Sequence, residues 1–165
     1  MSPARCPTPD VTLLPRRTAA VVLLAVLAAT GLAACGDDDG GSPDVRVEGA
    51  VLPAPAGANG ALYLRLVNDG DGSDRLLGAT TEAADGVELH ETRAGDDGLS
   101  RMVPVDEVEV GPGETVTFEP GGLHVMLLGV DPLEVGDRLT VVLDLERSGD
   151  LEVEVPVGTV ADALG

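Results

Sequence analysis

The sequence predicts an all-β protein, because three features recur between residues 45 and 157. Short segments alternate apolar and polar residues with a period of two, as in Val45–Val51 (VRVEGAV) and Leu151–Val157 (LEVEVPV). Glycine and proline interrupt these segments at intervals of roughly eight to twelve residues. No window shows the repeat of an amphipathic helix. Many short strands at this spacing are typical of a β-sandwich or a β-barrel.

The same features place the individual strands. We expect strands, in chain order, over residues 45–51, 60–68, 75–81, 86–92, 99–105, 106–110, 114–120, 123–130, 137–147 and 151–157. Clusters of glycine, proline, aspartate and asparagine separate these segments, and such residues favour turns. The turn before residue 114 is Gly111-Pro112-Gly113, and the turn before residue 123 contains Gly121-Gly122.

The first third of the chain has the pattern of an export signal. Residues 1–17 carry three arginines and one aspartate, and Thr18–Thr30 is an uncharged run of thirteen residues. That run suits the apolar core of a signal peptide and is shorter than the ~20 residues of a transmembrane helix. We therefore expect residues 1–34 to be a signal peptide that directs the protein to the extracytoplasmic side.

A lipid attachment site follows the apolar run. Leu32-Ala33-Ala34-Cys35-Gly36 resembles a bacterial lipobox, in which the cysteine is lipidated and becomes the mature N-terminus. We expect Cys35 to anchor the protein to the bacterial cell membrane, since two or three acyl chains hold a protein far more firmly than one. The polar residues 36–44 (GDDDGGSPD) predict a flexible tether. Residues 45–157 then form the folded domain, and residues 158–165 a C-terminal tail.

Charge and cysteine content restrict the possible partners. The chain carries −19, and removal of residues 1–34 with their three arginines and one aspartate leaves −21. Such a surface repels nucleic acid and anionic headgroups and attracts cations or basic protein surfaces. Cys6 leaves with the signal and Cys35 is lipidated, so the mature domain has no disulfide and must be stabilised by its core.

Four potential metal ligands lie within residues 90–126. The chain has two histidines, His90 and His124, and its only methionines apart from Met1 are Met102 and Met126. His124 and Met126 are two residues apart in one expected strand, so they project from the same face. His90 and Met102 flank the expected turn at residues 95–98. Thioether and imidazole together favour Cu(I), because soft sulfur selects copper over harder divalent ions.

Other interpretations remain open from the residues alone. A Zn²⁺ or Cu(II) site could use the two histidines with carboxylates such as Glu88 or Glu91, and the methionines would then be dispensable. A metal-free sandwich used for surface interaction would leave the four residues without a role. An enzyme is disfavoured, because no serine of the mature chain lies in a nucleophile motif such as G-x-S-x-G. A blue-copper centre requires a cysteine thiolate that the mature domain lacks.

The spacing of the four residues resembles the motif of the PCu(A)C copper chaperones. That motif is His, an optional Met, ten residues, Met, twenty-one residues, His, any residue and Met. Here it is matched by His90, Met102, His124 and Met126, with Glu91 in place of the optional methionine. Flanking segments are also similar, among them Glu88-Leu89-His90-Glu91 and Gly121-Gly122-Leu123-His124-Val125-Met126. The resemblance covers roughly residues 45–157.

The resemblance implies a cupredoxin-like Greek-key β-sandwich that binds Cu(I) through His90, Met102, His124 and Met126. It also implies delivery of copper to a respiratory oxidase, notably to the Cu(A) centre of subunit II, often with a thiol-reducing or second copper-carrying partner. Glu91 departs from the motif, and in a strand it should face away from His90, as a solvated carboxylate.

Overall fold

Alternating apolar and polar residues form ten strands in the computed structural model, which describes residues 40–95 and 98–163. The strands are β1 (Val45–Pro53), β2 (Asn59–Asn68), β3 (Asp74–Thr80), β4 (Ala84–Ala94), β5 (Ser100–Pro104), β6 (Val108–Val110), β7 (Thr115–Phe118), β8 (Leu123–Val130), β9 (Arg138–Leu145) and β10 (Gly149–Gly158). The prediction of an all-β fold is confirmed, and each expected strand has an observed counterpart. Within the described ranges, no helix is long and apolar enough to cross a bilayer.

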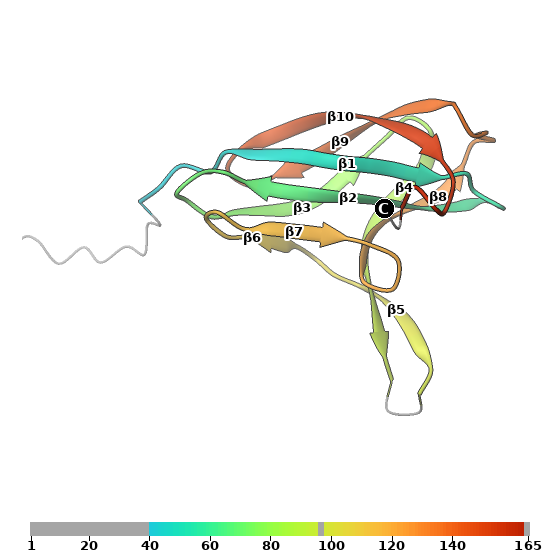
Figure 1. Cartoon of the computed structure of the whole chain (residues 1–165), viewed down its shortest axis with the longest axis horizontal. Coiled ribbons are helices and arrows are strands. Elements are labelled where there is room, and N and C mark those ends of the chain that lie inside the picture. The colour runs from blue at the N-terminus through green and yellow to red at the C-terminus, as the bar shows by residue number, and fades with distance from the viewer. Residues whose placement is uncertain (1–39, 96–97, 164–165) are drawn as a thin grey trace, which may run out of the picture. The chain divides into compact units, whose positions relative to one another are not determined.

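The strands form two layers that are joined at one edge (Figure 1). One layer has the order β5-β4-β8-β7-β2-β1, with β8 also pairing with β2, and the other has the order β10-β9-β3-β6. The layers are joined where β1 and β10 pair in parallel, with Leu52 opposite Val157. The chain passes repeatedly between the layers, for example from β3 to β4 and from β8 to β9, which gives the predicted sandwich.

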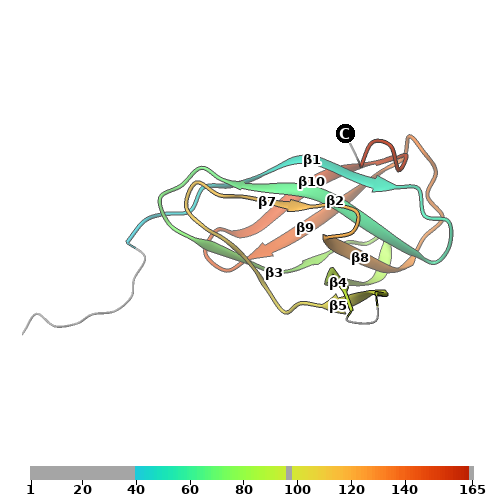
Figure 2. The ribbon, with the colours of Figure 1, turned by 60° about the horizontal axis from the view of Figure 1, so that its bottom comes forward.

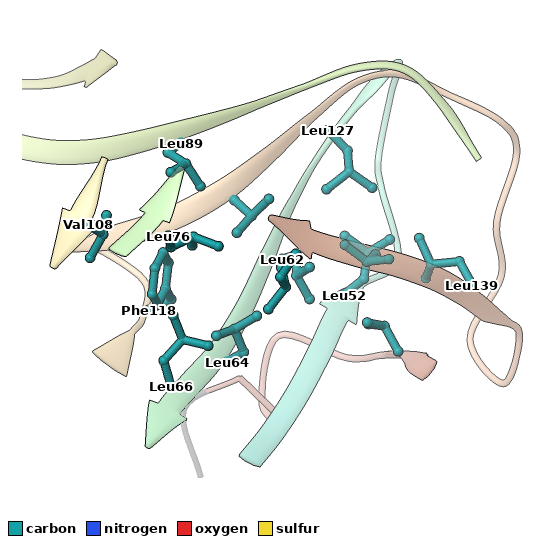
Figure 3. Close-up of a cluster of buried hydrophobic side chains, with 14 of the residues drawn as sticks. Leu52, Leu62, Leu64, Leu66, Leu76, Leu89, Val108, Phe118, Leu127 and Leu139 are labelled. Carbon is teal, nitrogen blue, oxygen red and sulfur yellow. The ribbon is translucent and has the colours of Figure 1, made fainter. Parts of the chain in front are cut away.

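Leucine and valine side chains fill the space between the layers (Figure 3). On the first layer, the buried side chains of this core include Leu62 and Leu66 of β2 and Leu127 of β8, each at most 1% exposed. The second layer contributes residues such as Leu143 and Val141 of β9, both fully buried. Phe118 is the one aromatic member of this cluster among the described residues. Burial of apolar surface at ~25 cal/mol per Å² is therefore the main stabilising contribution.

Residues 41–44, placed in the tether by sequence, are hydrogen-bonded to the folded domain. Asn68 is fully buried, and its Oδ1 accepts from the backbone N of Asp44 at 3.0 Å. Its Nδ2 donates to the carbonyl oxygens of Gly72 and Val110. Gly70 packs so closely on Ser42 that a Cβ atom there would lie 2.2 Å from the Ser42 carbonyl oxygen. This end of β2 therefore holds the incoming chain.

A buried carboxylate fastens the second layer nearby. Asp74 is 2% exposed, and its oxygens accept from the backbone N of Arg75, Arg147 and Ser148 at 2.8 to 2.9 Å. Burial alone would raise the pKa of Asp74, but the hydrogen bonds from Ser148, Arg147 and Arg75 outweigh it and hold this pKa below its usual value. The ionised carboxylate therefore joins the start of β3 to the β9–β10 turn.

We predict that Asp74→Asn lowers the free energy of unfolding by about 2 kcal/mol at neutral pH, because the amide replaces an ionised acceptor of backbone N–H groups. A depressed folded-state pKa stabilises the fold above the unfolded-state pKa of ~3.9, and this stabilisation is lost as pH falls through the folded-state pKa. The difference between the two proteins should therefore shrink below about pH 4.

Urea unfolding from pH 7 to pH 3 measures this difference. The matched control is Asp131→Asn at an exposed position, which should change stability by less than about 0.5 kcal/mol. A constant difference across the pH range would contradict the assigned role of the Asp74 carboxylate.

Candidate metal centre

Strand β8 carries the central pair of candidate ligands. Its side chains alternate, so Val125 and Leu127 are fully buried in the core while His124 and Met126 project from the opposite face of the same layer. β8 lies between β4 on one side and β7 and β2 on the other. His124 and Met126 are therefore held on an interior strand rather than at a sheet edge.

The register of the neighbouring strands brings the other two candidates to this face. His90 of β4 lies directly opposite His124, and Glu88 lies opposite Met126. Met102 of β5 lies opposite Thr92, two residues beyond His90 on β4. Directly opposite residues share a face, and so do residues two apart. All four predicted residues are thus on one face of the layer. Two of them, His90 and Met102, belong to the β4–β5 hairpin, which extends from the sandwich (Figure 1).

The four side chains differ in burial. His124 is 4% exposed, whereas Met102 on the edge strand β5 is 60% exposed. A hollow of about 350 Å³ is lined by Met102, His124 and Met126, together with Thr92 and Tyr63. Burial raises the pKa of Tyr63 above its usual value, so the phenol keeps its proton at neutral pH. The hollow therefore combines two thioethers and an imidazole with access from solvent.

The turn before β8 orients His124. His124 Nδ1 donates to the Gly122 carbonyl oxygen at 3.1 Å, which leaves Nε2 with a lone pair. The same carbonyl accepts from the backbone N of Thr92 at 3.0 Å and so ties β4 to this turn. Gly121 has a φ of 85°, a conformation that favours glycine. The Gly121-Gly122 turn therefore positions the Gly122 carbonyl oxygen beside Nδ1 of His124. As a result, Nε2 is the nitrogen of His124 that would be available to a metal.

His90 is oriented from the other side. Its ring centroid lies 5.7 Å from that of His124, in an edge-to-face arrangement at 80°. His90 Nε2 lies 2.8 Å from Glu88 Oε2, and a carboxylate can only accept, so Nε2 carries the proton. Among the described residues, His90 Nδ1 is buried without a hydrogen-bond partner. Each ring therefore keeps one nitrogen lone pair that none of the described groups uses.

The carboxylate of Glu91 is not directed at the four candidate ligands. Glu91 Oε2 accepts from Arg93 Nε at 2.6 Å, on the side of β4 that the alternation predicts. Within residues 40–95 and 98–163, no three His, Cys, Asp or Glu side chains lie close enough to hold one metal ion. The described donor set is thus two imidazoles and two thioethers, all neutral and borderline or soft, which suits Cu(I) better than Zn²⁺.

Sequence reasoning located the four candidate ligands but missed the groups that orient them. The sequence indicates Glu88 only as a possible ligand and Gly122 only as a turn residue. The two-residue spacing of Glu88 and His90 in a strand was the available signal. The acceptor of the His124 hydrogen bond is a backbone carbonyl, and every residue has one, so the sequence gives no indication of it. Cys35 lies outside the described residues.

The sequence matches a known family over its folded part. The model of the family described as "Putative lipoprotein LpqE-like" matches residues 44–157. A Leifsonia xyli subsp. xyli protein described as "Putative lipoprotein Lxx21020" is 31% identical over 153 residues, which are 91% of this chain and 92% of the relative. A Rickettsia prowazekii protein, RP573, is 31% identical over 119 residues, or 70% of this chain and 61% of that protein.

Solved structures of copper proteins are similar to this fold. The copper-bound PCuAC domain of PmoF2 has a TM-score of 0.60 at 27% identity and covers 70% of this chain and 92% of that domain. The Cu(I) form of DR1885 from Deinococcus radiodurans has a TM-score of 0.53 at 27% identity, covering 82% of this chain and 86% of the other. These likenesses confirm the cupredoxin-like fold and the resemblance to PCu(A)C domains. With the match over residues 44–157, they show that the chain belongs to the LpqE-like family.

Proposed function

We propose that this protein is a copper chaperone that binds one Cu(I) ion through His90, Met102, His124 and Met126. The observation that carries the proposal is the pair of facing histidines, each with one unused ring nitrogen, beside two methionines on the same face. The copper-bound PmoF2 and DR1885 domains share this fold. Two thioethers beside two imidazoles form a donor set that suits soft Cu(I) better than harder divalent ions.

The exposure of the donors supports a carrier rather than an enzyme. Met102 is 60% exposed on an edge strand, whereas His124 is buried on an interior strand. An incoming ligand from an acceptor can therefore replace the Met102 thioether first, while the histidines still hold the ion. Stepwise ligand exchange of this kind passes copper on without releasing it into solution.

The acceptor follows from the PCu(A)C resemblance and the export signal. We propose that lipidated Cys35 anchors the protein on the extracytoplasmic face of the cell membrane, and its relative from Leifsonia xyli is also described as a lipoprotein. Copper would then pass to a respiratory oxidase, at the Cu(A) site of subunit II. A thiol-reducing or second copper-carrying protein would assist. The surface charge disfavours nucleic acid as a partner.

The first prediction from the proposed function concerns the thioethers of Met102 and Met126. Residues 39–165 form one compact unit whose described core uses only its own residues, and this unit should bind one Cu(I) in a competition titration against a Cu(I) chelator. Met102→Leu/Met126→Leu conserves side-chain volume but removes both sulfur donors, and should weaken binding by at least about 100-fold, or ~2.7 kcal/mol.

The matched control is Leu99→Met, which adds a thioether at another exposed position of the β4–β5 hairpin and should leave the affinity unchanged. Binding that survives without Met102 and Met126 would favour a Zn²⁺ or Cu(II) site of histidines and carboxylates. Absence of Cu(I) binding in the unsubstituted protein would leave a metal-free surface-interaction sandwich.

A second prediction follows from the unequal exposure of the methionines. Peroxide should convert Met102 to the sulfoxide well before the partly buried Met126, because oxidation requires access to the sulfur. Peptide mapping by mass spectrometry of the copper-free protein measures the rate at each methionine. Equal rates at Met102 and Met126 would contradict the structure.

A third prediction concerns the distance that the proposed copper site can reach from the membrane anchor at Cys35. Because residues 42 and 44 are hydrogen-bonded to the domain, the tether expected from the sequence shortens to residues 36–40, and a flexible segment of that length has a typical span of about 11–13 Å. The proposed site lies near Ala61, which is opposite Met126. Asn68 follows Ala61 by seven positions along β2, and this length of strand adds about 23 Å.

Deleting residues 37–40 should therefore lower the Cu(A) content of membranes, measured spectroscopically. Cys35→Ser, which cannot be lipidated, should lower it further. Unchanged Cu(A) content in both variants would count against delivery from a membrane anchor.

A further inference from the structure

We propose that Glu88 is a positioning residue of this site, which holds His90 through Nε2–H so that His90 binds copper through Nδ1 while His124 binds it through Nε2. The inference rests on the proposed function, since it specifies which atoms of the proposed ligands contact the ion. It assigns to Glu88 a role that acts through His90 and not by direct contact with copper.

The contact between Glu88 and His90 is set by the strand. The two residues are two apart on β4 and therefore share a face. Their Oε2 and Nε2 atoms are 2.8 Å apart, while the His90 side chain is 14% exposed and that of Glu88 51% exposed. The carboxylate thus reaches from solvent onto a mostly buried ring. A histidine whose second nitrogen donates to a carboxylate is a more basic and better oriented metal ligand.

The remaining nitrogen of His90 is the one available for coordination. His90 Nδ1 is buried and has no hydrogen-bond partner within the part of the chain that the structure describes. A buried acceptor without a partner destabilises the folded protein, and a coordinated metal ion would remove that penalty. Because Nε2 donates to Glu88, Nδ1 is the nitrogen of His90 whose lone pair would be open to a metal ion.

His124 has the opposite arrangement. Its Nδ1 donates to the Gly122 carbonyl oxygen, so Nε2 is the free nitrogen. One ring is therefore fixed by a carboxylate two residues earlier in its strand, and the other by a backbone carbonyl two residues earlier. The carboxylate also supplies negative charge near a site whose four proposed donors are neutral. No comparable role is open to Glu91, whose carboxylate pairs with Arg93.

The test uses residues 39–165 with ¹⁵N-labelled histidine and two readouts. In the copper-free protein, long-range ¹H–¹⁵N spectra should show His90 protonated at Nε2 and His124 protonated at Nδ1. Addition of Cu(I) should move the ¹⁵N shifts of His90 Nδ1 and His124 Nε2. Copper-induced movement of His90 Nε2 as the coordinating nitrogen would overturn the proposal.

Variants separate positioning from general charge effects. Glu88→Ala should lower Cu(I) affinity about 10–100-fold, and Glu88→Gln, which retains an acceptor oxygen, should recover part of the loss. Glu91→Ala, the matched control, removes the same charge three residues further along β4 and should bind as the unsubstituted protein does. Equal Cu(I) affinities for Glu88→Ala and Glu91→Ala would overturn the role assigned to Glu88 and leave the proposed function standing. Failure of the unsubstituted protein to bind Cu(I) would overturn the proposed function together with this inference.

Discussion

The two-residue alternation of β8 is the constraint on which the rest of the site depends. Val125 and Leu127 must enter the core, where both are fully buried. The residues between them, His124 and Met126, are then obliged to project from the other face. A shift of register by one residue would exchange the two sets and place polar ligands in the core. The burial that stabilises the sandwich therefore also fixes the direction of two proposed ligands.

Neighbouring strands add candidate ligands that differ in exposure. β4 pairs with β8 along most of its length and brings His90 opposite His124. β5 pairs only with β4 and lies at the edge of its layer, so Met102 is exposed. In Figure 2 the β4–β5 hairpin lies beside β8 at one side of the molecule. An arrangement with two largely buried histidines and an exposed thioether suits an ion that is first bound and then transferred to another protein.

Two groups of buried polar contacts that support the fold lie away from this face. Asn68 and Asp74 gather backbone donors and acceptors near the start of β1 and at the β9–β10 turn. The proposed ligands lie toward the other end of β2, where Ala61 is opposite Met126. Because the two regions share few residues, changes to the ligands should alter copper binding more than folding, and changes to Asp74 the reverse. The described residues contain no cysteine, so the core and these polar contacts hold the sandwich.

The sequence by itself determined the strand content and the candidate ligands. Period-two alternation and the glycine and proline punctuation are local properties, so each strand was predictable to within a few residues. The spacing of His90, Met102, His124 and Met126 was readable for the same reason. Local pattern also placed His124 and Met126 on one face, because they share a strand.

Only the tertiary structure decided how the strands meet. The pairing that sets His90 opposite His124 joins segments more than thirty residues apart, and alternation within each strand leaves their mutual register open. The choice of ring nitrogen depends on Glu88 Oε2 and the Gly122 carbonyl oxygen, whose positions follow from side-chain packing and turn geometry. The docking of residues 41–44 was likewise invisible, since a polar glycine-rich segment becomes ordered only when a partner such as Asn68 supplies its hydrogen bonds.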